Sequence, residues 1–232
     1  MPAPIVIAVD GPAGSGKSSV CRGVAQQMGL QYLDTGAMYR AMTLAVLQAD
    51  QDPGNADAVR ALLPSVVITS DTDPAAPAIL LNGQNVSAAV RGAEVTAAVS
   101  SVSAIPEVRL AMVALQRAEV SRTLSDGVGI VVEGRDIGSV VLPDASVKVF
   151  LTADPQVRAQ RRASETDGAE VAVTQAQLQA RDALDAGRKV SPMTRAEDAV
   201  EIDTTALTLP EVVEAVCAHV LSARGQSSEM SS

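Results

Sequence analysis

The sequence predicts an α/β fold built on a five-stranded parallel sheet flanked by helices. Five short segments of strand composition are separated by stretches of helical composition, an order typical of βαβ units and therefore of parallel strands. Hydrophobic residues make up 47% of the 232 residues, which is enough to bury the core that such a fold requires. We expect one domain spanning residues 1–224.

The first strand is expected at residues 5–9, a continuous apolar run typical of a strand buried on both faces. A glycine-rich turn and a helix that stops at Gly29 follow. A second strand at 31–33 leads to Asp34, and a helix is predicted over 36–48. Strand, helix, strand and helix in this order predict parallel pairing.

The pattern changes between about residues 51 and 98. Short strands are expected at 65–70 and 78–81, and Asn82-Gly83 is a turn signal directly after the second strand. We interpret this region as a small mixed insertion of two or three strands outside the parallel sheet. A helix over 95–103 leads back, and Pro106 opens a helix that ends near Arg122.

The remaining core strands are expected at 128–132, 147–151 and 200–203. Before the last of them, Pro155 opens a helix, 164–173 is a polar loop, and a further helix covers 174–185. We interpret residues of about 156–188 as a helical lid. A closing helix is expected over 209–223, and residues 225–232 are expected to form a flexible tail.

Composition excludes several classes of function. The net charge of -9 and the presence of only three aromatic residues disfavour binding to nucleic acid polymers. His219 is the only histidine, and Cys21 and Cys217 have no metal-ligand spacing, which disfavours zinc sites and histidine-based catalysis. No signal peptide or bilayer-spanning stretch is recognised, so we expect a cytoplasmic monomer that binds no membrane.

A complete phosphate-binding motif, G-x-x-x-x-G-K-[ST], lies between the first strand and the first helix. Its backbone N–H groups and the helix dipole would bind ATP phosphates, Lys17 would reach the β- and γ-phosphates, and the Ser18 hydroxyl would ligate Mg²⁺. Ser19 and Arg158 are also predicted to bind ATP. The motif residues are Gly11, Pro12, Ala13, Gly14, Ser15, Gly16, Lys17 and Ser18.

Two further segments follow strand ends. The segment Asp34-Thr35-Gly36-Ala37-Met38-Tyr39-Arg40 should face the same crevice as the P-loop, because ligands bind beyond the carboxyl ends of parallel strands. Thr35 could donate a hydrogen bond there and Arg40 could bind phosphate. In the alternative interpretation, Asp34 caps a helix and Arg40 is a solvated surface residue. The segment Glu133-Gly134-Arg135-Asp136 is either a second part of this site or a surface turn with a local ion pair.

Five arginines flank the polar loop of the expected lid. Arg158, Arg161 and Arg162 share one helix face, and Arg181 and Arg188 follow the loop. Such a face is often only solvated, but few acidic partners are near in sequence, Glu165 being the obvious one. We interpret these arginines as a lid that closes over polyphosphate.

These segments together resemble the cytidylate kinase family, from Ile5 to about Ala223. The resemblance rests on the P-loop, on D-T-G-A-M-Y-R at Asp34, on E-G-R-D-I-G at Glu133, and on R-D-x-x-D-x-x-R from Arg181 to Arg188. It implies the P-loop kinase fold and a monophosphate-binding insertion at 51–98.

The resemblance also implies the roles of individual residues. The acceptor phosphate would be held by Thr35, Arg40 and Arg135. The cytosine ring would be read by Ser100, Arg109 and Asp136. The sugar and phosphate side would be contacted by Arg181, Asp185 and Arg188, and catalysis would use Lys17, Arg135, Arg161 and Arg188. Thr35 replaces the commoner serine, and the tract from Arg181 to Arg188 carries less charge than is usual in the family.

The predicted reaction is transfer of the γ-phosphoryl group of ATP to CMP or dCMP, with Mg²⁺ as cofactor. Two alternatives remain at this stage. One is another small P-loop kinase acting on UMP or on a small acid, and the other is a P-loop regulator that binds nucleotide without phosphoryl transfer. The insertion and the D-T-G-A-M-Y-R segment favour a nucleotide acceptor.

Overall fold

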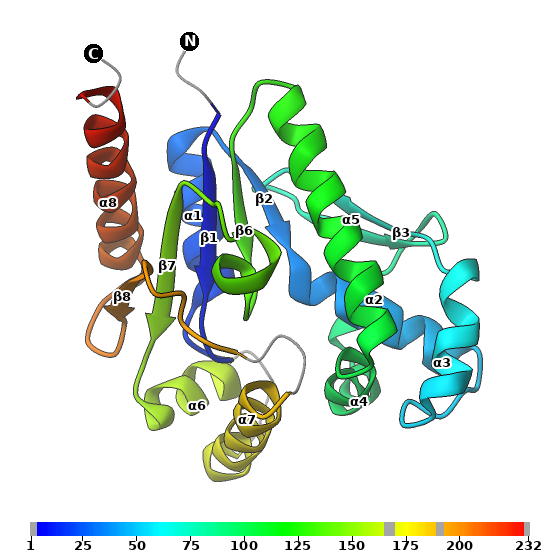
Figure 1. Cartoon of the computed structure of the whole chain (residues 1–232). Helices are drawn as coiled ribbons and strands as arrows, with labels where there is room; N and C mark the ends of the chain where they lie inside the picture. Colours follow the sequence, from blue (N-terminus) through cyan, green and yellow to red (C-terminus); the bar gives the residue numbers. More distant parts are fainter. Residues whose placement is uncertain (1–3, 165–169, 189–192, 230–232) are drawn as a thin grey trace.

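A computed structural model of the chain describes residues 4–164, 170–188 and 193–229. Its main sheet consists of β1 (Val6–Asp10), β2 (Gln31–Asp34), β6 (Ile130–Glu133), β7 (Val147–Thr152) and β8 (Val200–Asp203). The strand order is β2-β6-β1-β7-β8 and all neighbours pair in parallel (Figure 1). The predicted five-stranded parallel sheet is therefore confirmed, and β1 lies at its centre.

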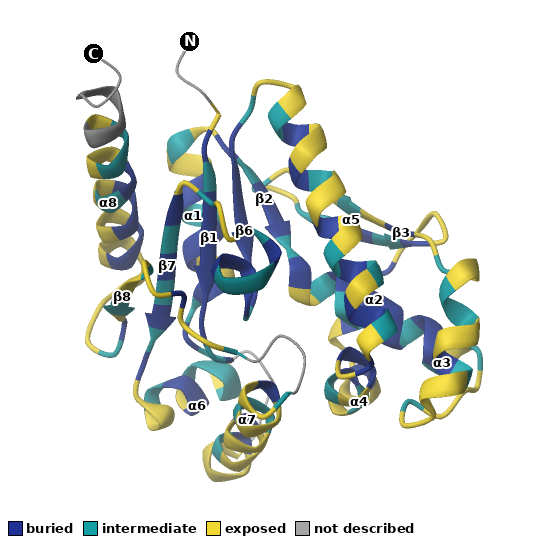
Figure 2. Ribbon diagram, in the orientation of Figure 1, coloured by how far each residue is buried: buried dark blue, intermediate teal, exposed yellow. Residues whose placement is uncertain are grey.

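Helices cover both faces of this sheet. On one face, α1 (Lys17–Met28) and α8 (Leu209–Glu229) pack over Ile7 and Val9 of β1 and Val131 of β6. On the other face, α2 (Thr35–Gln48), α4 (Ala93–Ser103) and α5 (Pro106–Ser125) enclose the alternate side chains of the same strands, among them Ala8. Figure 2 shows the central strands β1 and β6 largely buried between these layers, whereas the edge strand β8 is mostly exposed. The continuous apolar runs are thus explained, because each central strand contributes to two cores.

The insertion is separate from the main sheet. It contains α3 (Ala56–Leu62), the short helix η1 (Leu63–Ser65), and a three-stranded sheet of β3 (Ile68–Asp71), β4 (Ala78–Leu81) and β5 (Gln84–Asn85). Both strand pairs are antiparallel. Asn82 and Gly83 have φ values of 50° and 81° in the turn between β4 and β5, as the turn signal predicted.

The elements that follow the insertion carry the chain across the carboxyl ends of the strands. The short helix η2 (Ala89–Arg91) precedes α4, the π-helical turn η3 (Ile137–Val141) follows β6, and α6 (Pro155–Ser164) and α7 (Val171–Ala186) lie beyond the tips of the strands (Figure 1). The closing helix α8 continues to Glu229, beyond the predicted end at 223, so residues 225–229 of the expected tail are helical. Residues 230–232 lie outside the described part.

Within the described residues, no single helix has both the length and the hydropathy of a bilayer span. Only α4 and α5 taken together, which meet at a bend of 100°, reach that length and composition. Both cysteines lie in helices, Cys21 in α1 and Cys217 in α8, and both are buried free thiols.

Candidate active site

The P-loop joins β1 to α1 in a conformation that requires glycine. Gly11 has a φ of 146°, and a Cβ atom there would lie 2.1 Å from the carbonyl oxygen of Leu151. Gly14 has a φ of 77°, and its Cβ would lie 2.8 Å from the carbonyl oxygen of Arg158 on α6. The loop is therefore in close contact with both β7 and α6, which no other residue type would allow at these two positions.

Lys17 folds back across the P-loop. Its Nζ donates to the carbonyl oxygen of Pro12 at 2.6 Å and to Ser15 Oγ at 3.4 Å. Burial, together with repulsion from Arg135, lowers the pKa of Lys17 to about 7, while Glu133 acts in the opposite direction. A polyphosphate bound here would favour the charged ammonium form, because an anion next to a buried cation raises its pKa.

Ser18, the predicted magnesium ligand, contacts a carboxylate at the end of β6. Its hydroxyl donates to Glu133 Oε1 at 2.8 Å. Burial, followed by the neighbouring Asp34 carboxylate, raises the pKa of Glu133 to about 8. Glu133 Oε2 is buried and has no hydrogen-bond partner among the described residues. A hydroxyl beside an unused carboxylate oxygen fits a hard cation such as Mg²⁺.

Mg²⁺ would need further oxygen ligands at this place. No cluster of three or more His, Cys, Asp or Glu side chains suited to a metal occurs in the part of the chain that the structure describes. Mg²⁺ commonly takes only one or two protein ligands and completes its octahedron with substrate phosphates and water. The donor set around Ser18 therefore fits a magnesium ion that binds together with ATP phosphates.

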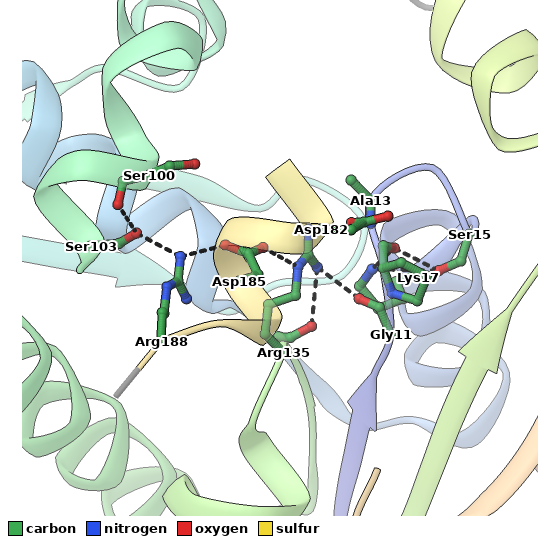
Figure 3. A network of polar contacts seen from close by, with 12 residues as sticks. Gly11, Ala13, Ser15, Lys17, Ser100, Ser103, Arg135, Asp182, Asp185 and Arg188 are labelled. Atoms are coloured by element: carbon green, nitrogen blue, oxygen red, sulfur yellow. Dashed lines mark hydrogen bonds and ion pairs between the residues drawn. The ribbon is translucent and has the colours of Figure 1, made fainter. Parts of the chain in front are cut away.

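A continuous set of polar contacts connects the P-loop with α4 (Figure 3). Arg135 donates from one terminal nitrogen to the carbonyl oxygen of Gly11 at 3.0 Å and from Nε to Asp185 at 3.1 Å. Asp185, on α7, is buried and also accepts from Arg188. Arg188 in turn donates to Ser103 Oγ at 2.9 Å. Four predicted site residues, which come from three separate parts of the sequence, are thus joined by direct contacts.

Arg40 and Arg181 form a second positively charged region beside Arg135. Burial and repulsion between arginines lower the pKa of Arg181 to about 9 and that of Arg40 to about 10. Arg135 and Arg162 contribute to both shifts. Arg181 Nε is buried without a hydrogen-bond partner among the described residues. Concentrated positive charge with an unused donor is suited to bind a phosphate group.

Arg40 is not the solvated surface residue of the alternative interpretation. It is half-buried on α2 and donates to Thr96 Oγ1 at 2.9 Å and to the carbonyl oxygen of Val90 at 3.3 Å. Asp34 does cap this helix, as that interpretation predicted, because its carboxylate accepts from the backbone N–H of Ala37 at 2.9 Å.

Arg109 and Asp136 form an ion pair that is almost completely buried, with exposed fractions of 2% and 4%. The guanidinium carbon of Arg109 also lies 5.5 Å from the centre of the Tyr39 ring. Because Asp136 pairs with Arg109 and Arg135 pairs with Asp185, the expectation of a merely local ion pair between residues 135 and 136 is wrong.

Thr35 and Ser100 lie at the edge of these groups. Thr35 Oγ1 donates its only proton to the carbonyl oxygen of Glu133 at 2.6 Å. In this conformation the Thr35 hydroxyl could only accept a hydrogen bond from a ligand, whereas the sequence suggested that it would donate one. Ser100, on α4, is half-buried, and its carbonyl oxygen accepts from Ser103 Oγ at 3.2 Å (Figure 3).

The helices α6 and α7 are connected to the P-loop by one arginine and one aspartate. Arg158 is buried, donates to the carbonyl oxygen of Ala13 at 3.0 Å, and forms an ion pair with Asp182 of α7. Asp182 also accepts from the backbone N–H of Ala13 at 3.3 Å. The sequence suggested Glu165 as the acidic partner of this helix face. Glu165 lies outside the described residues, and the observed partner of Arg158 comes from α7.

Arg161 contacts the segment that follows β8. Its guanidinium donates to Thr204 Oγ1 at 2.8 Å and to the Thr204 carbonyl oxygen at 2.7 Å. Thr204 Oγ1 donates to the carbonyl oxygen of Ser15 at 3.3 Å. Arg161 is thus bound to the segment after β8 and reaches the P-loop only through Thr204.

Two acidic residues of this site were not predicted. Glu133 contacts Ser18, and Asp182 contacts both Ala13 and Arg158. Both stand inside motifs that were recognised, E-G-R-D-I-G and R-D-x-x-D-x-x-R. Their positions inside these motifs were the available sign of a role in the site. Their partners could not be predicted, because Ser18 and Ala13 lie more than 100 residues away from them in the sequence.

The parallel sheet, the P-loop after its central strand and the arginines beyond the strand ends define a P-loop kinase fold. A gluconokinase structure from Sinorhizobium meliloti shares this fold, with a TM-score of 0.51, 18% identity, and coverage of 99% of this chain and 98% of that one. The profile of the cytidylate kinase family matches residues 7–222, and the chain belongs to this family. The resemblance inferred from the motifs is therefore confirmed.

The chain is also similar to individual members of the family. It is 51% identical over 212 residues to a cytidylate kinase of Streptomyces griseus, covering 91% of this chain and 90% of that protein. It is 49% identical over 219 residues to a cytidylate kinase of Mycobacterium avium, covering 92% and 94% respectively. These similarities extend over the P-loop, the insertion and the arginine-rich helices together.

Proposed function

We propose that the protein transfers the γ-phosphoryl group of ATP to CMP or dCMP and releases CDP or dCDP and ADP. Together with the membership of the cytidylate kinase family, one structural observation supports this proposal. Arg135 contacts the P-loop at Gly11 and also contributes to the positive region around Arg40 and Arg181. A donor phosphate in the P-loop and an acceptor phosphate on the arginines would therefore lie on either side of Arg135.

The chemistry requires positioning and charge neutralisation. An anionic oxygen of the CMP phosphate attacks the γ-phosphorus of ATP in line, and the bond to the β,γ-bridging oxygen breaks. Lys17 and Arg135 supply positive charge to the transferring group, and Arg188 is held towards the acceptor side by Asp185 and Ser103. No covalent enzyme intermediate is needed.

Mg²⁺ is the proposed cofactor, with Ser18 as its protein ligand and the Glu133 carboxylate beside it. When bound, Mg²⁺ would neutralise charge on the β- and γ-phosphates. Ser18 and Ser19 begin α1, so their backbone also lies at the positive end of that helix dipole.

The Arg109–Asp136 pair is the proposed reader of the base. Cytosine presents an amine donor and the acceptor N3, whereas uracil presents an acceptor and a donor at the same positions. Asp136 can only accept when ionised, and Arg109 can only donate. The pair therefore complements cytosine and opposes uracil, and its burial increases the cost of a mismatch. Ser100 on the neighbouring helix is proposed to assist.

We also propose that α6 and α7 act as a lid. Arg158 and Asp182 connect both helices to the P-loop at Ala13. Helices held in this place would exclude water from the transferring group. The protein is expected to act as a cytoplasmic monomer.

A panel of acceptors tests the proposed function. Purified protein is incubated with Mg·ATP and CMP, dCMP, UMP, AMP, GMP or shikimate, and ADP release is followed. We expect rapid turnover with CMP and dCMP and much slower turnover with the others. Faster turnover of UMP or shikimate than of CMP would show that the proposed acceptor is wrong. ATP binding with no ADP release in the presence of each acceptor would indicate a regulator.

A further inference from the structure

Asp10 is a buried carboxylate that the proposed chemistry does not use. It ends β1 directly before Gly11 and is 4% exposed. Its two oxygens accept from two successive backbone N–H groups, Oδ1 from Ile137 and Oδ2 from Gly138, each at 2.8 Å. A carboxylate that accepts from two successive backbone N–H groups holds the donating segment in one orientation.

The two donors open the turn η3, which follows directly after Arg135 and Asp136. The first N–H groups of a helical turn lack partners within the turn, and Asp10 supplies them. Gly138 lies between Asp10 and Lys148, since a Cβ atom there would lie 3.5 Å from Asp10 Oδ2 and 3.2 Å from the Lys148 side chain. The two hydrogen bonds to Asp10 therefore attach the start of the turn directly to the end of β1.

Other contacts attach the same segment to the end of β1. The backbone N–H of Gly134 donates to the carbonyl oxygen of Val9 at 3.0 Å, and Arg135 donates to that of Gly11 at 3.0 Å. These two contacts use only main-chain oxygens of β1 and the P-loop. Asp10 is the residue between Val9 and Gly11, and its side chain anchors the following two residues of the turn.

We propose that Asp10 is a positioning residue for the acceptor. Its carboxylate fixes the turn that presents Arg135 and Asp136, so that the base-reading and phosphate-binding groups keep a constant place relative to the P-loop. This inference rests on the proposed function, since it assigns the effect to the nucleotide acceptor. The P-loop residues proposed to bind ATP have contacts of their own, such as those of Lys17 with Pro12 and Ser15, and these contacts do not use the Asp10 carboxylate.

The test uses Asp10→Asn, which keeps the shape of the side chain. The amide oxygen can accept one N–H group, but the amide nitrogen then faces the second N–H donor, so the turn is released on one side. Asp198→Asn is the matched control, because Asp198 is an exposed carboxylate that pairs with Lys148 on the far side of Gly138. Steady-state kinetics are measured with each substrate varied in turn, and CMP and ATP binding are measured by calorimetry.

We expect Asp10→Asn to lower kcat/KM for CMP by about 10²-fold, the effect of a displacement near 1 Å in a reacting site. The KM and the calorimetric Kd for ATP should stay at the wild-type values, and Asp198→Asn should match the wild type in every measurement. Equal losses for CMP and ATP, or wild-type kinetics of Asp10→Asn, would overturn the inference.

A second variant addresses the same contact from the turn. Gly138→Pro removes the backbone N–H group that donates to Asp10 Oδ2 and should produce the same selective loss for CMP. It serves as the deciding measurement if Asp10→Asn does not fold, and an unchanged CMP efficiency would then refute the inference. Failure of the proposed function is separable, because it would appear as absent CMP turnover in the wild-type protein.

Discussion

The buried carboxylate of Asp10 leads to a prediction about stability that is opposite in sign to that for a salt-bridged aspartate. Burial raises its pKa from 3.8 to about 6, with a contribution from Asp136, while the two backbone N–H donors and Lys17 act in the opposite direction. The folded protein therefore binds this proton more tightly than the unfolded chain. Between pH 3.8 and 6 the contribution of Asp10 to stability must fall as the pH rises.

The size of the effect follows from the two pKa values. The interval between 3.8 and about 6 corresponds to about 3 kcal/mol, because one pKa unit corresponds to about 1.4 kcal/mol. Asp10→Asn removes this titration without changing the size of the side chain. The free energy of unfolding of the wild type, relative to that of Asp10→Asn, should therefore increase by up to about 3 kcal/mol as the pH is lowered from 7.5 to 4.

Urea unfolding of both proteins at a series of pH values measures this difference. Taking the difference removes the titrations that both proteins share, including those of Glu133 and Lys17, whose pKa values are also shifted. A difference that stays constant between pH 4 and 7.5 would refute the reasoning. It would mean that the hydrogen bonds from Ile137 and Gly138 fully offset the burial of the charge.

Three further variants test the remaining roles. Lys17→Ala should lower kcat by about 10²–10³-fold with unchanged circular dichroism, and wild-type ADP release would contradict phosphoryl transfer in the P-loop. Arg40→Ala should weaken CMP binding by about 1.5–3 kcal/mol and leave ATP binding unchanged, as measured by calorimetry. Arg122→Ala, at an exposed arginine, is the control. Equal weakening of CMP and ATP binding would show that Arg40 is not specific to the acceptor site. Asp136→Asn should narrow the CMP-to-UMP ratio of kcat/KM, since an amide can donate or accept opposite the base; an unchanged ratio would remove Asp136 from base reading.

The elements that the sequence predicted well are those with a local signal. The strands β1, β6 and β7 contain runs of apolar residues, and the P-loop is complete within eight residues. The end of α8 was predicted too early, because Gly225 and a polar composition were interpreted as a helix stop. A polar helix end has no apolar periodicity to mark it, and glycine lowers helix propensity without excluding a helix.

The contacts between site residues depend on tertiary distances that the sequence does not contain. Asp10 and Ile137 are 127 residues apart, and Asp182 and Ala13 are 169 residues apart. Motif resemblance pointed to many of the residues that the structure brings together at the candidate site. It did not indicate that the Thr35 hydroxyl would donate to the carbonyl oxygen of Glu133, because that hydrogen bond depends on the distance between the ends of β2 and β6.

The charges in this site are arranged at a cost to the stability of the folded chain without ligands. Asp10 and Glu133 are buried carboxylates with raised pKa values, and Arg40 and Arg181 are arginines whose pKa values are lowered by burial and by one another. Each of these shifts means that folding disfavours the charged form. A protein selected for stability alone would replace such groups, and sites that retain them do so where function requires a fixed, charged environment. The arginines would be stabilised by bound phosphate and Glu133 by a nearby Mg²⁺. The hydrogen bonds of Asp10 come from the backbone N–H groups of Ile137 and Gly138, and we therefore attribute its retention to positioning.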